Sequence, residues 1–296
     1  MIYKKTLSDY LFDNIILIML IIISIFAVIP ILHVISISFS DKASVSAGMV
    51  TLWPVRPTLA PYSAVLDDRN FWVSFFVSVK RVLLGGAINL VFTILMAFPL
   101  SRSVKKFRFR NVYMWIVVFT MLFNSGLIPW YLTIKNLGLL DSIWALVLPG
   151  AVPVFNVIIL MNFFRDIPRE IEEAAIIDGT NPWKLLLLIF IPLSMPALAT
   201  VTLFSIVDHW NEFFDGLILM KSQQNYPLQT YMNQLVIQFS TVMTTMSPEQ
   251  VAKMMKLSDR TVNAAKIVIS MIPILAVYPF LQRYLITGLT LGSVKE

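Results

Sequence analysis

Six long apolar segments alternate with polar ones along the chain. The hydrocarbon core of a bilayer is about 30 Å thick, so a helix that crosses it needs roughly 20 mostly apolar residues. Segments of about this kind lie at residues 15–39, 82–100, 112–132, 143–164, 193–220 and 264–285. The first is longer than the roughly 7–15 residues of a signal-peptide core, so we expect it to be retained. The pattern predicts an all-α polytopic membrane protein in which residues 1–296 form a single transmembrane domain.

Composition excludes most other classes. Of the 296 residues, 57% are hydrophobic and 14% charged, and the mean hydropathy is +0.77. A soluble domain carries roughly 25% charged residues. The absence of cysteine rules out a disulfide framework, and His33 and His209 are too scattered for a zinc site. Basic loops beside membrane spans explain the net charge of +6, so we expect no bound metal and no nucleic acid.

Basic residues predict the orientation. The short loop after the second span contains Arg102, Lys105, Lys106, Arg108 and Arg110 without an acid. Lysine and arginine favour the cytoplasmic side. With six spans, both termini are then predicted to be cytoplasmic.

Two residues argue against this orientation, because Lys80 and Arg81 would lie at the outer end of the second span. The same orientation predicts long outer segments at about 41–72 and 221–260. Each is interpreted either as a solvated cap or as a docking surface for an outside partner.

No catalytic or nucleotide-binding motif is present. The chain contains no G-x-x-x-x-G-K-[ST], G-x-G-x-x-G, HExxH or G-x-S-x-G sequence. We therefore expect no catalytic residues and no cofactor in this chain. The grouping of Asp208, His209 and Glu212 keeps an alternative open, an ion-coupled secondary transporter or an intramembrane enzyme.

The predicted cytoplasmic segment at about 167–190 has the pattern of two short helices joined at a fixed bend. Pro168 suits a first helical turn, and the acids that follow it suit the positive end of a helix. Gly179 suits the left-handed residue that ends a helix. Asn181 and Pro182 suit the start of the next helix. The small side chains of Ala174 and Ala175 would let another surface approach closely.

This segment resembles the EAA loop of ABC importer permeases. Glu173-Ala174-Ala175 is followed after three residues by Gly179 and after nine more by Ile189-Phe190-Ile191-Pro192. The pattern is EAA–x3–G–x9–I–x–L–P, and Ile191 replaces the usual leucine. Residues 124–140, 210–213, 226–229 and 288–295 resemble the carbohydrate-uptake branch, most of all the second permease of aldouronate and complex-oligosaccharide importers.

The resemblance implies a transport subunit in the bacterial cell membrane, with a type I ABC importer fold. Its implied partners are a sister permease, two cytoplasmic ATPase subunits that bind ATP and Mg, and an extracytoplasmic solute-binding lipoprotein. The implied substrate is an oligosaccharide. The EAA helix would seat in a groove of the ATPase, with Glu173 as the polar contact and Gly179 as the turn. The implied coupling residues are Glu173, Ala174, Ala175, Asp178 and Gly179.

Polar residues inside the spans are candidates for the translocation path. An acid at the bilayer centre costs about 2.5–3.5 kcal/mol, so such residues face a wet or protein-lined interior. At helical spacing Asp208, Asn211, Glu212 and Asp215 would share one face. Trp210 is either a stacking surface for sugar rings or an interfacial anchor. The path candidates are Asn124, Trp210, Asn211 and Glu212. For Asn124, Asn156 and Asn162, interhelical hydrogen bonds are the favoured interpretation.

Overall fold

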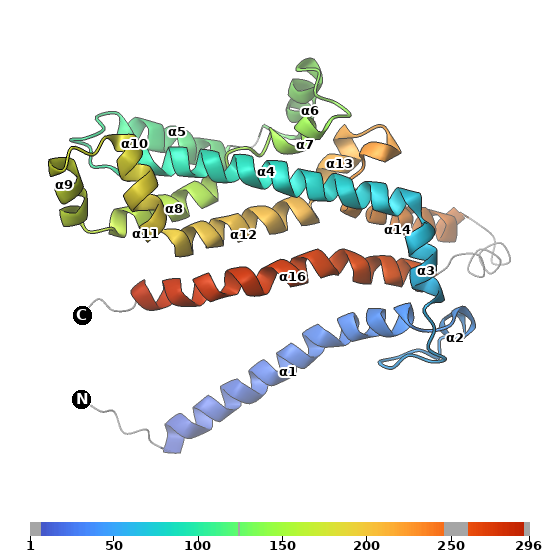
Figure 1. Cartoon of the computed structure of the whole chain (residues 1–296). Coiled ribbons are helices and arrows are strands. Elements are labelled where there is room, and N and C mark those ends of the chain that lie inside the picture. The colour runs from blue at the N-terminus through green and yellow to red at the C-terminus, as the bar shows by residue number, and fades with distance from the viewer. Residues whose placement is uncertain (1–6, 124, 246–259, 293–296) are drawn as a thin grey trace. The chain divides into compact units, whose positions relative to one another are not determined.

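The structure, a computed structural model, describes residues 7–123, 125–245 and 260–292 and, of these, the side chains of 9–123, 125–236 and 260–279. Every regular element in these ranges is a helix (Figure 1). The predicted all-helical class is therefore confirmed. The chain divides into two compact units: unit 1 is formed by residues 1–69 with 238–271, and unit 2 by residues 70–237 with 272–296.

Unit 1 is organised around the end of a long exposed helix. The large apolar side chains of α1 (Leu7–Ser38) from Tyr10 to Leu32 are exposed, as expected of a helix whose solvent is lipid. In its last turn Ser36 and Ser38 are buried, and Ser36 donates a hydrogen bond to the Leu52 carbonyl at 2.7 Å. The end of α1 is thereby fixed to the segment that carries the next two helices. These are α2 (Lys42–Ser46) and α3 (Ala60–Asp67).

Unit 2 contains an extensive apolar core shared by several helices. Buried side chains such as Leu100, Leu160 and Phe164 meet there, and the rings of Phe98, Phe164 and Phe190 contact one another edge to face at centroid distances of 5.3–6.4 Å. Edge-to-face packing at such distances is favourable beyond the burial of area. The long helices of this core are α4 (Arg69–Ser101), α5 (Arg110–Leu122), α8 (Val154–Asp166) and α12 (Met195–Asn211).

Short helices cover the ends of α8 and α12 (Figure 1). At one end, which we call the α9 end, lie α9 (Arg169–Ile177), α10 (Pro182–Leu185), the π-helical turn η1 (Leu186–Phe190) and α11 (Ile191–Leu193). Beyond the other ends lie α6 (Leu127–Asn136), α7 (Ile143–Val147), α13 (Phe214–Leu219) and the 3-10 turn η2 (Gln223–Asn225). The remaining helices are α14 (Leu228–Thr245) and α16 (Arg260–Gly292).

Fewer uninterrupted helices than predicted are long enough to cross a membrane. Within the described residues, α1, α4 and Arg260–Pro279 qualify by length and composition. The number rises to five if two bent pairs each count as one span. These pairs are α5 with α6, bent by 111°, and Pro182–Leu193 with α12, bent by 83°. The predicted span at 143–164 is divided between α7 and α8.

Proline explains that division. Pro149 and Pro153 lie between the end of α7 and the start of α8, and proline lacks the N–H that a helix needs and disfavours helical geometry at the preceding residue. The fourth apolar segment is thus interrupted at these prolines. Pro273 and Pro279, by contrast, lie inside the continuous α16.

The second helix long enough to cross a membrane begins earlier than the hydropathy pattern predicts. The predicted span covers residues 82–100, whereas α4 begins at Arg69, so Lys80 and Arg81 lie inside the helix. The predicted outer segment before it, 41–72, is shorter by the first residues of α4. Lys80 and Arg81 lower the hydropathy of this stretch, so the hydropathy pattern did not predict the first part of the helix. In the other predicted outer segment, 221–260, residues 246–259 lie outside the described residues.

Candidate functional site

The segment at 167–190 folds as its sequence predicts. It contains α9 and α10, separated by four residues. Glu170 and Glu172 occupy the first turn of α9, where negative charge is favourable. After α9, Gly179 adopts a φ of +75°, and the Thr180 N–H donates to the Ala175 carbonyl at 3.0 Å. This is the helix ending that glycine permits without strain.

The second helix of the segment begins with the expected cap. The Asn181 side chain accepts a hydrogen bond from the Lys184 N–H at 2.8 Å, and Pro182 occupies the first helical position. The two caps fix the chain on both sides of the bend. The segment therefore has a defined bend between its two helices, and we call residues 167–190 the α9 corner.

Most of the implied coupling residues are exposed. Glu173, Ala174 and Asp178 face solvent, whereas Ala175 is buried in the apolar core of unit 2. Ala175 thus allows close packing within this chain. Beside the acids, Ile177 is 85% and Trp183 is 62% exposed. These two large apolar side chains are exposed on the two sides of the bend between α9 and α10.

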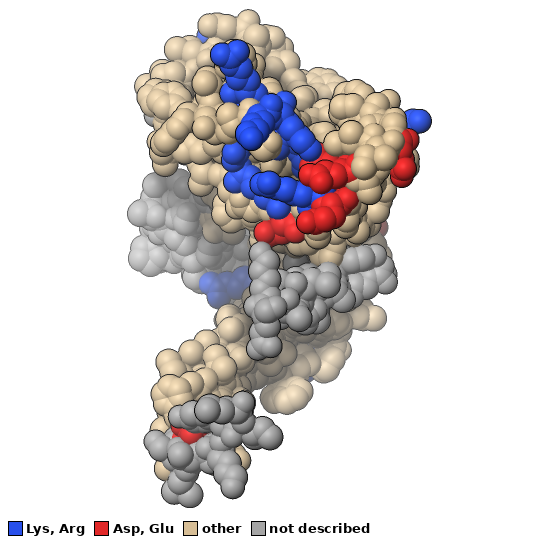
Figure 2. Space-filling model, turned by 90° about the vertical axis from the view of Figure 1, so that its left-hand side faces the viewer, with Lys and Arg blue, Asp and Glu red and all other residues tan. Residues whose placement is uncertain are grey.

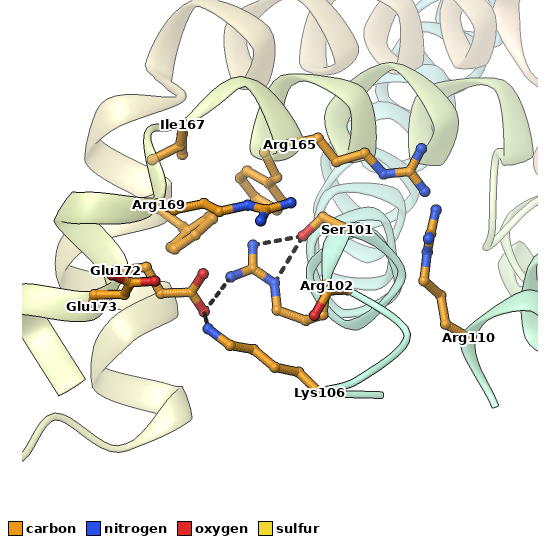
Figure 3. A pocket seen from close by; sticks show the side chains of 12 residues that line it. Ser101, Arg102, Lys106, Arg110, Arg165, Ile167, Arg169, Glu172 and Glu173 are labelled. Carbon is orange, nitrogen blue, oxygen red and sulfur yellow. Dashed lines mark hydrogen bonds and ion pairs between the residues drawn. The ribbon is translucent and has the colours of Figure 1, made fainter. Parts of the chain in front are cut away.

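Glu172, which directly precedes the EAA sequence, ties α9 to the end of α4. Its carboxylate lies 2.9 Å from the Arg102 guanidinium and 3.0 Å from the Lys106 amine (Figure 3). The Arg102 guanidinium also lies over the rings of Phe98 at 4.7 Å and Phe190 at 4.1 Å. Stacking and ion pairing together hold a planar guanidinium in one orientation. Burial raises the pKa of Glu172, but the contacts with Lys106 and Arg102 outweigh it, and the pKa lies below its ordinary value.

Sequence reasoning did not identify this Glu172–Arg102 contact. The available signal was an acid-free basic loop and an acidic helix that were both predicted to lie on the cytoplasmic side. Their contact in the structure places both at the same end of unit 2. Neither Glu172 nor Arg102 belongs to the EAA pattern.

A cavity of about 330 Å³ opens between the ends of α4, α5, α8 and α9. Figure 2 shows Lys and Arg side chains gathered beside a smaller group of acids on this face. Arg110 and Arg165 both donate to the Leu100 carbonyl oxygen, at 2.9 and 3.2 Å. The charged residues that line the cavity are Arg102, Lys106, Arg110, Arg165, Arg169, Glu172 and Glu173.

Two of the four path candidates, Trp210 and Glu212, have structural partners within unit 2. Trp210 is buried, and the edge of its ring contacts Phe75 at a centroid distance of 5.7 Å. Asn211 is exposed at the end of α12. Glu212 accepts hydrogen bonds from the N–H groups of Phe214 at 2.7 Å and Asp215 at 3.3 Å, so it caps α13. Asn124 lies outside the described residues.

The predicted shared face of Asp208, Asn211, Glu212 and Asp215 is wrong, because α12 ends at Asn211 and a new helix begins at Phe214. Asp215 is turned toward α4 and forms an ion pair with Arg81 at 2.9 Å. Arg81 is 2% exposed and also donates to the Glu212 carbonyl at 3.1 Å. A cation inside an apolar helix requires such a partner.

Asp208 faces a second cavity, of about 300 Å³, in unit 2. Asn89 and Asn156 line the same cavity, together with the rings of Phe155 and Phe204. Asn156 donates to Ser205 Oγ at 3.2 Å, which confirms the expected interhelical hydrogen bond. Polar groups with aromatic faces suit a sugar.

The alternative based on Asp208, His209 and Glu212 has no support in this geometry. His209 is buried, and its Nε2 lies 3.1 Å from the Asn89 amide. Glu212 caps α13, and Asp208 lines the cavity. The three side chains therefore have different partners. Across the described ranges, no group of three or more His, Cys, Asp or Glu residues could hold a metal ion.

The fold and the α9 corner define a class of membrane transport subunit. Residues 89–291 match the family model of the binding-protein-dependent transport system inner membrane component, and the chain belongs to this family. The expected resemblance to sugar-uptake ABC permeases is confirmed by the relatives that follow.

Similar proteins cover nearly the whole chain. The polygalacturonan/rhamnogalacturonan transport system permease protein YtcP of Bacillus subtilis (strain 168) is 38% identical, over 98% of this chain and 100% of the relative. Protein LplC of the same organism is 40% identical, over 90% and 89%. A chain in the crystal structure of a bacterial ABC transporter that imports the acidic polysaccharide alginate is 34% identical, over 95% and 99%, with a TM-score of 0.84.

Proposed function

We propose that this chain is one of two permease subunits of an ATP-driven, solute-binding-protein-dependent importer of oligosaccharides. Two of the relatives named above belong to systems that transport polysaccharides, one for polygalacturonan/rhamnogalacturonan and one for the acidic polysaccharide alginate. Uronate-containing oligosaccharides are therefore the first substrates to test. A chain of an alginate transporter, described in complex with an alginate-bound periplasmic protein, shares the fold at 15% identity and a TM-score of 0.58. An extracytoplasmic binding protein and a sister permease are accordingly proposed partners here.

The coupling proposal rests on the exposed side chains of α9 and α10. A corner that is capped on both sides presents Glu173, Ile177 and Trp183 to solvent at one end of unit 2. We infer that a cytoplasmic ATPase covers this surface. Closure of two ATPase subunits would displace the corner as a rigid body, and α8 and α12 would move with it.

The proposed orientation places the α9 end in the cytoplasm. The basic loop at 102–110 and α9 touch through Arg102 and Glu172, so both lie on one side. Lys80 and Arg81 argue less against this orientation than the sequence suggested, because both lie inside α4 and not in a loop. The positive-inside rule counts the lysine and arginine residues of short loops and span ends.

Affinity purification of the full chain from its own membrane, with mass spectrometry of the co-purifying proteins, tests the assembly. The expected result is one sister permease, two copies of an ATPase and a lipoprotein. A well-folded chain recovered alone would contradict the proposal.

Two variants test the coupling surface. Glu173→Lys and Gly179→Asp should abolish sugar uptake while the chain remains inserted and abundant. Glu170→Lys, with the same charge change on the same helix, should retain most uptake. Intact transport by the Gly179→Asp variant would rule out the proposed coupling role of this turn.

A further inference from the structure

Three arginines that line the cavity at the α9 end, Arg110, Arg165 and Arg169, belong to none of the ion pairs among the described residues. On one side of the cavity, Glu172 forms ion pairs with Arg102 and Lys106. Two of the three arginines, Arg110 and Arg165, share the Leu100 carbonyl oxygen as an acceptor. Figure 3 shows these two guanidinium groups close to each other at one side of the cavity, Arg110 from α5 and Arg165 from α8.

The Leu100 carbonyl explains only part of this arrangement. As one of the last carbonyls of α4 it has no partner within the helix and attracts cations. It accepts one N–H from each arginine, whereas a guanidinium has five N–H donors in a planar fork. Burial lowers the pKa of Arg165, which lies just beyond the predicted fourth span, and the charge of Arg110 lowers it further. An anion between the two groups would relieve that repulsion.

The surroundings indicate which anion fits. Arg110 is the first residue of α5, and Val112, Trp115 and Phe119 of this helix are exposed. An apolar helix surface that begins beside a pair of arginines offers room for acyl chains next to a site for a charged headgroup. Arginine forks match phosphate oxygens in a bidentate manner, and basic pockets at the cytoplasmic ends of membrane helices bind anionic headgroups.

We propose that Arg110 and Arg165 bind the phosphate of an anionic phospholipid at the cytoplasmic end of unit 2. The lipid headgroup would occupy the side of the cavity opposite the Glu172–Arg102 contact. Its occupancy would hold the ends of α4, α5 and α8 together beside the coupling segment. This inference rests on the proposed membrane orientation but not on the docking of an ATPase.

The test uses the complete importer, purified in detergent and titrated with phosphatidylglycerol or phosphatidylcholine, with bound lipid counted by native mass spectrometry. The wild-type complex should retain phosphatidylglycerol in preference to phosphatidylcholine. Arg110→Gln/Arg165→Gln should weaken that retention at least about tenfold, since two charge-assisted contacts are lost. The matched control is Lys105→Gln/Arg108→Gln, which removes two exposed charges from the same loop outside the cavity and should retain the lipid.

The outcomes separate the possible sources of the anion. If inorganic phosphate raises the melting temperature of the wild-type complex but not of the double variant, and phosphatidylglycerol adds nothing, the site binds free phosphate and not lipid. If the double variant retains phosphatidylglycerol but loses the ATPase, the pair serves an acidic side chain of that partner and the proposal is wrong.

If the double variant assembles poorly, single variants provide the test. Arg165→Gln should weaken retention of phosphatidylglycerol, and Arg165→Lys should restore only part of it, because lysine keeps the charge but not the fork. Equal retention in all three forms would also overturn the proposal.

Discussion

Two adjacent glycines in α4 differ in their surroundings. A Cβ at Gly85 would overlap the imidazole of His209, whereas a Cβ at Gly86 would meet nothing within 4 Å. His209 is itself buried against Asn89, so it has little room to withdraw. The contact between α4 and α12 therefore requires the absence of a side chain at one of the two positions.

Gly85→Ala should destabilise the protein by about 1–3 kcal/mol, as overpacking of a close-packed interior does. Gly86→Ala should be neutral or stabilising by about 0.5–1 kcal/mol, because alanine is the better helix former. Thermal unfolding of the two purified variants beside the wild type measures the difference. Equal effects of both substitutions would mean that α4 and α12 do not meet at Gly85.

Asp141 is a second residue with a position-specific role. At a φ of +58° it accepts hydrogen bonds from Ser222 Oγ at 2.6 Å and from the N–H groups of Lys221 and Ser222 at 3.0 Å. The hydrogen bonds from Ser222 above all hold the pKa of Asp141 well below its ordinary value. The carboxylate thus joins the segments before α7 and after α13.

This contact should depend on pH. Because folding lowers the pKa of Asp141, its contribution to stability is complete above the unfolded value of about 3.9 and is lost as the pH falls toward the folded value. The stability difference between wild type and Asp141→Asn should be largest near pH 7 and shrink below about pH 4. Asparagine tolerates the positive φ, so strain does not confound the comparison. A difference that stays constant from pH 7 to pH 3 would contradict the carboxylate's role.

At the scale of elements, Glu172 extends the attachment of α9 beyond its own neighbours in the chain. The sequence neighbours of the α9 corner are α8 and α10, but the contact with Arg102 adds α4. Arg102 in turn lies over Phe190 of η1. A displacement of α9 would therefore act together on its sequence neighbours α8 and α10, on α4 and on η1.

Glu172→Gln keeps the shape of the side chain and removes its charge. We expect a loss of about 1.5–3 kcal/mol in the attachment of α9, the range for hydrogen bonds to charged groups. In reconstituted importer, ATP hydrolysis should depend less on the loaded binding protein, and uptake per ATP should fall. Glu170→Gln, an exposed acid on the same helix, is the matched control. Wild-type coupling in the Glu172→Gln variant would show that α4 takes no part.

At the scale of the whole molecule, the absence of cysteine permits a direct test of orientation. Lys105→Cys and Gln224→Cys each place one thiol at an exposed position, the first in the basic loop near α9 and the second in η2. In intact cells, a membrane-impermeant maleimide should label position 224 and not position 105. In inverted vesicles the result should be reversed. Labelling of position 105 in intact cells would refute the proposed orientation.

Much of the candidate coupling site could be predicted from the sequence because its signals are local. Gly179, Asn181 and Pro182 act through their own backbone geometry, so a short stretch specifies the corner. The partners of Glu172 could not be predicted in this way. Arg102 lies 70 residues earlier in the chain, and only the packing of α4 against η1 and α9 brings the two together.

The interruptions of the helices were only partly predictable. Pro149 and Pro153 indicate that the helix of the fourth apolar segment is either broken or kinked. Proline does not distinguish the two, because Pro273 and Pro279 lie inside the continuous helix α16. The end of α12 at Asn211 had no such marker. There Glu212 caps a new helix, and Asp215 is drawn to Arg81 of α4.

Hydropathy and capping act over a few neighbouring residues, so the amino-acid sequence alone predicts a lipid environment, the helical class and the bend between α9 and α10. Which charges are neutralised depends on the tertiary structure. Arg81 and Arg102 have distant acidic partners, whereas Arg110 and Arg165 converge on one carbonyl oxygen. The reason is physical: an ion pair depends on distance in space, and distance in space is set by the packing of helices that the chain order does not reveal.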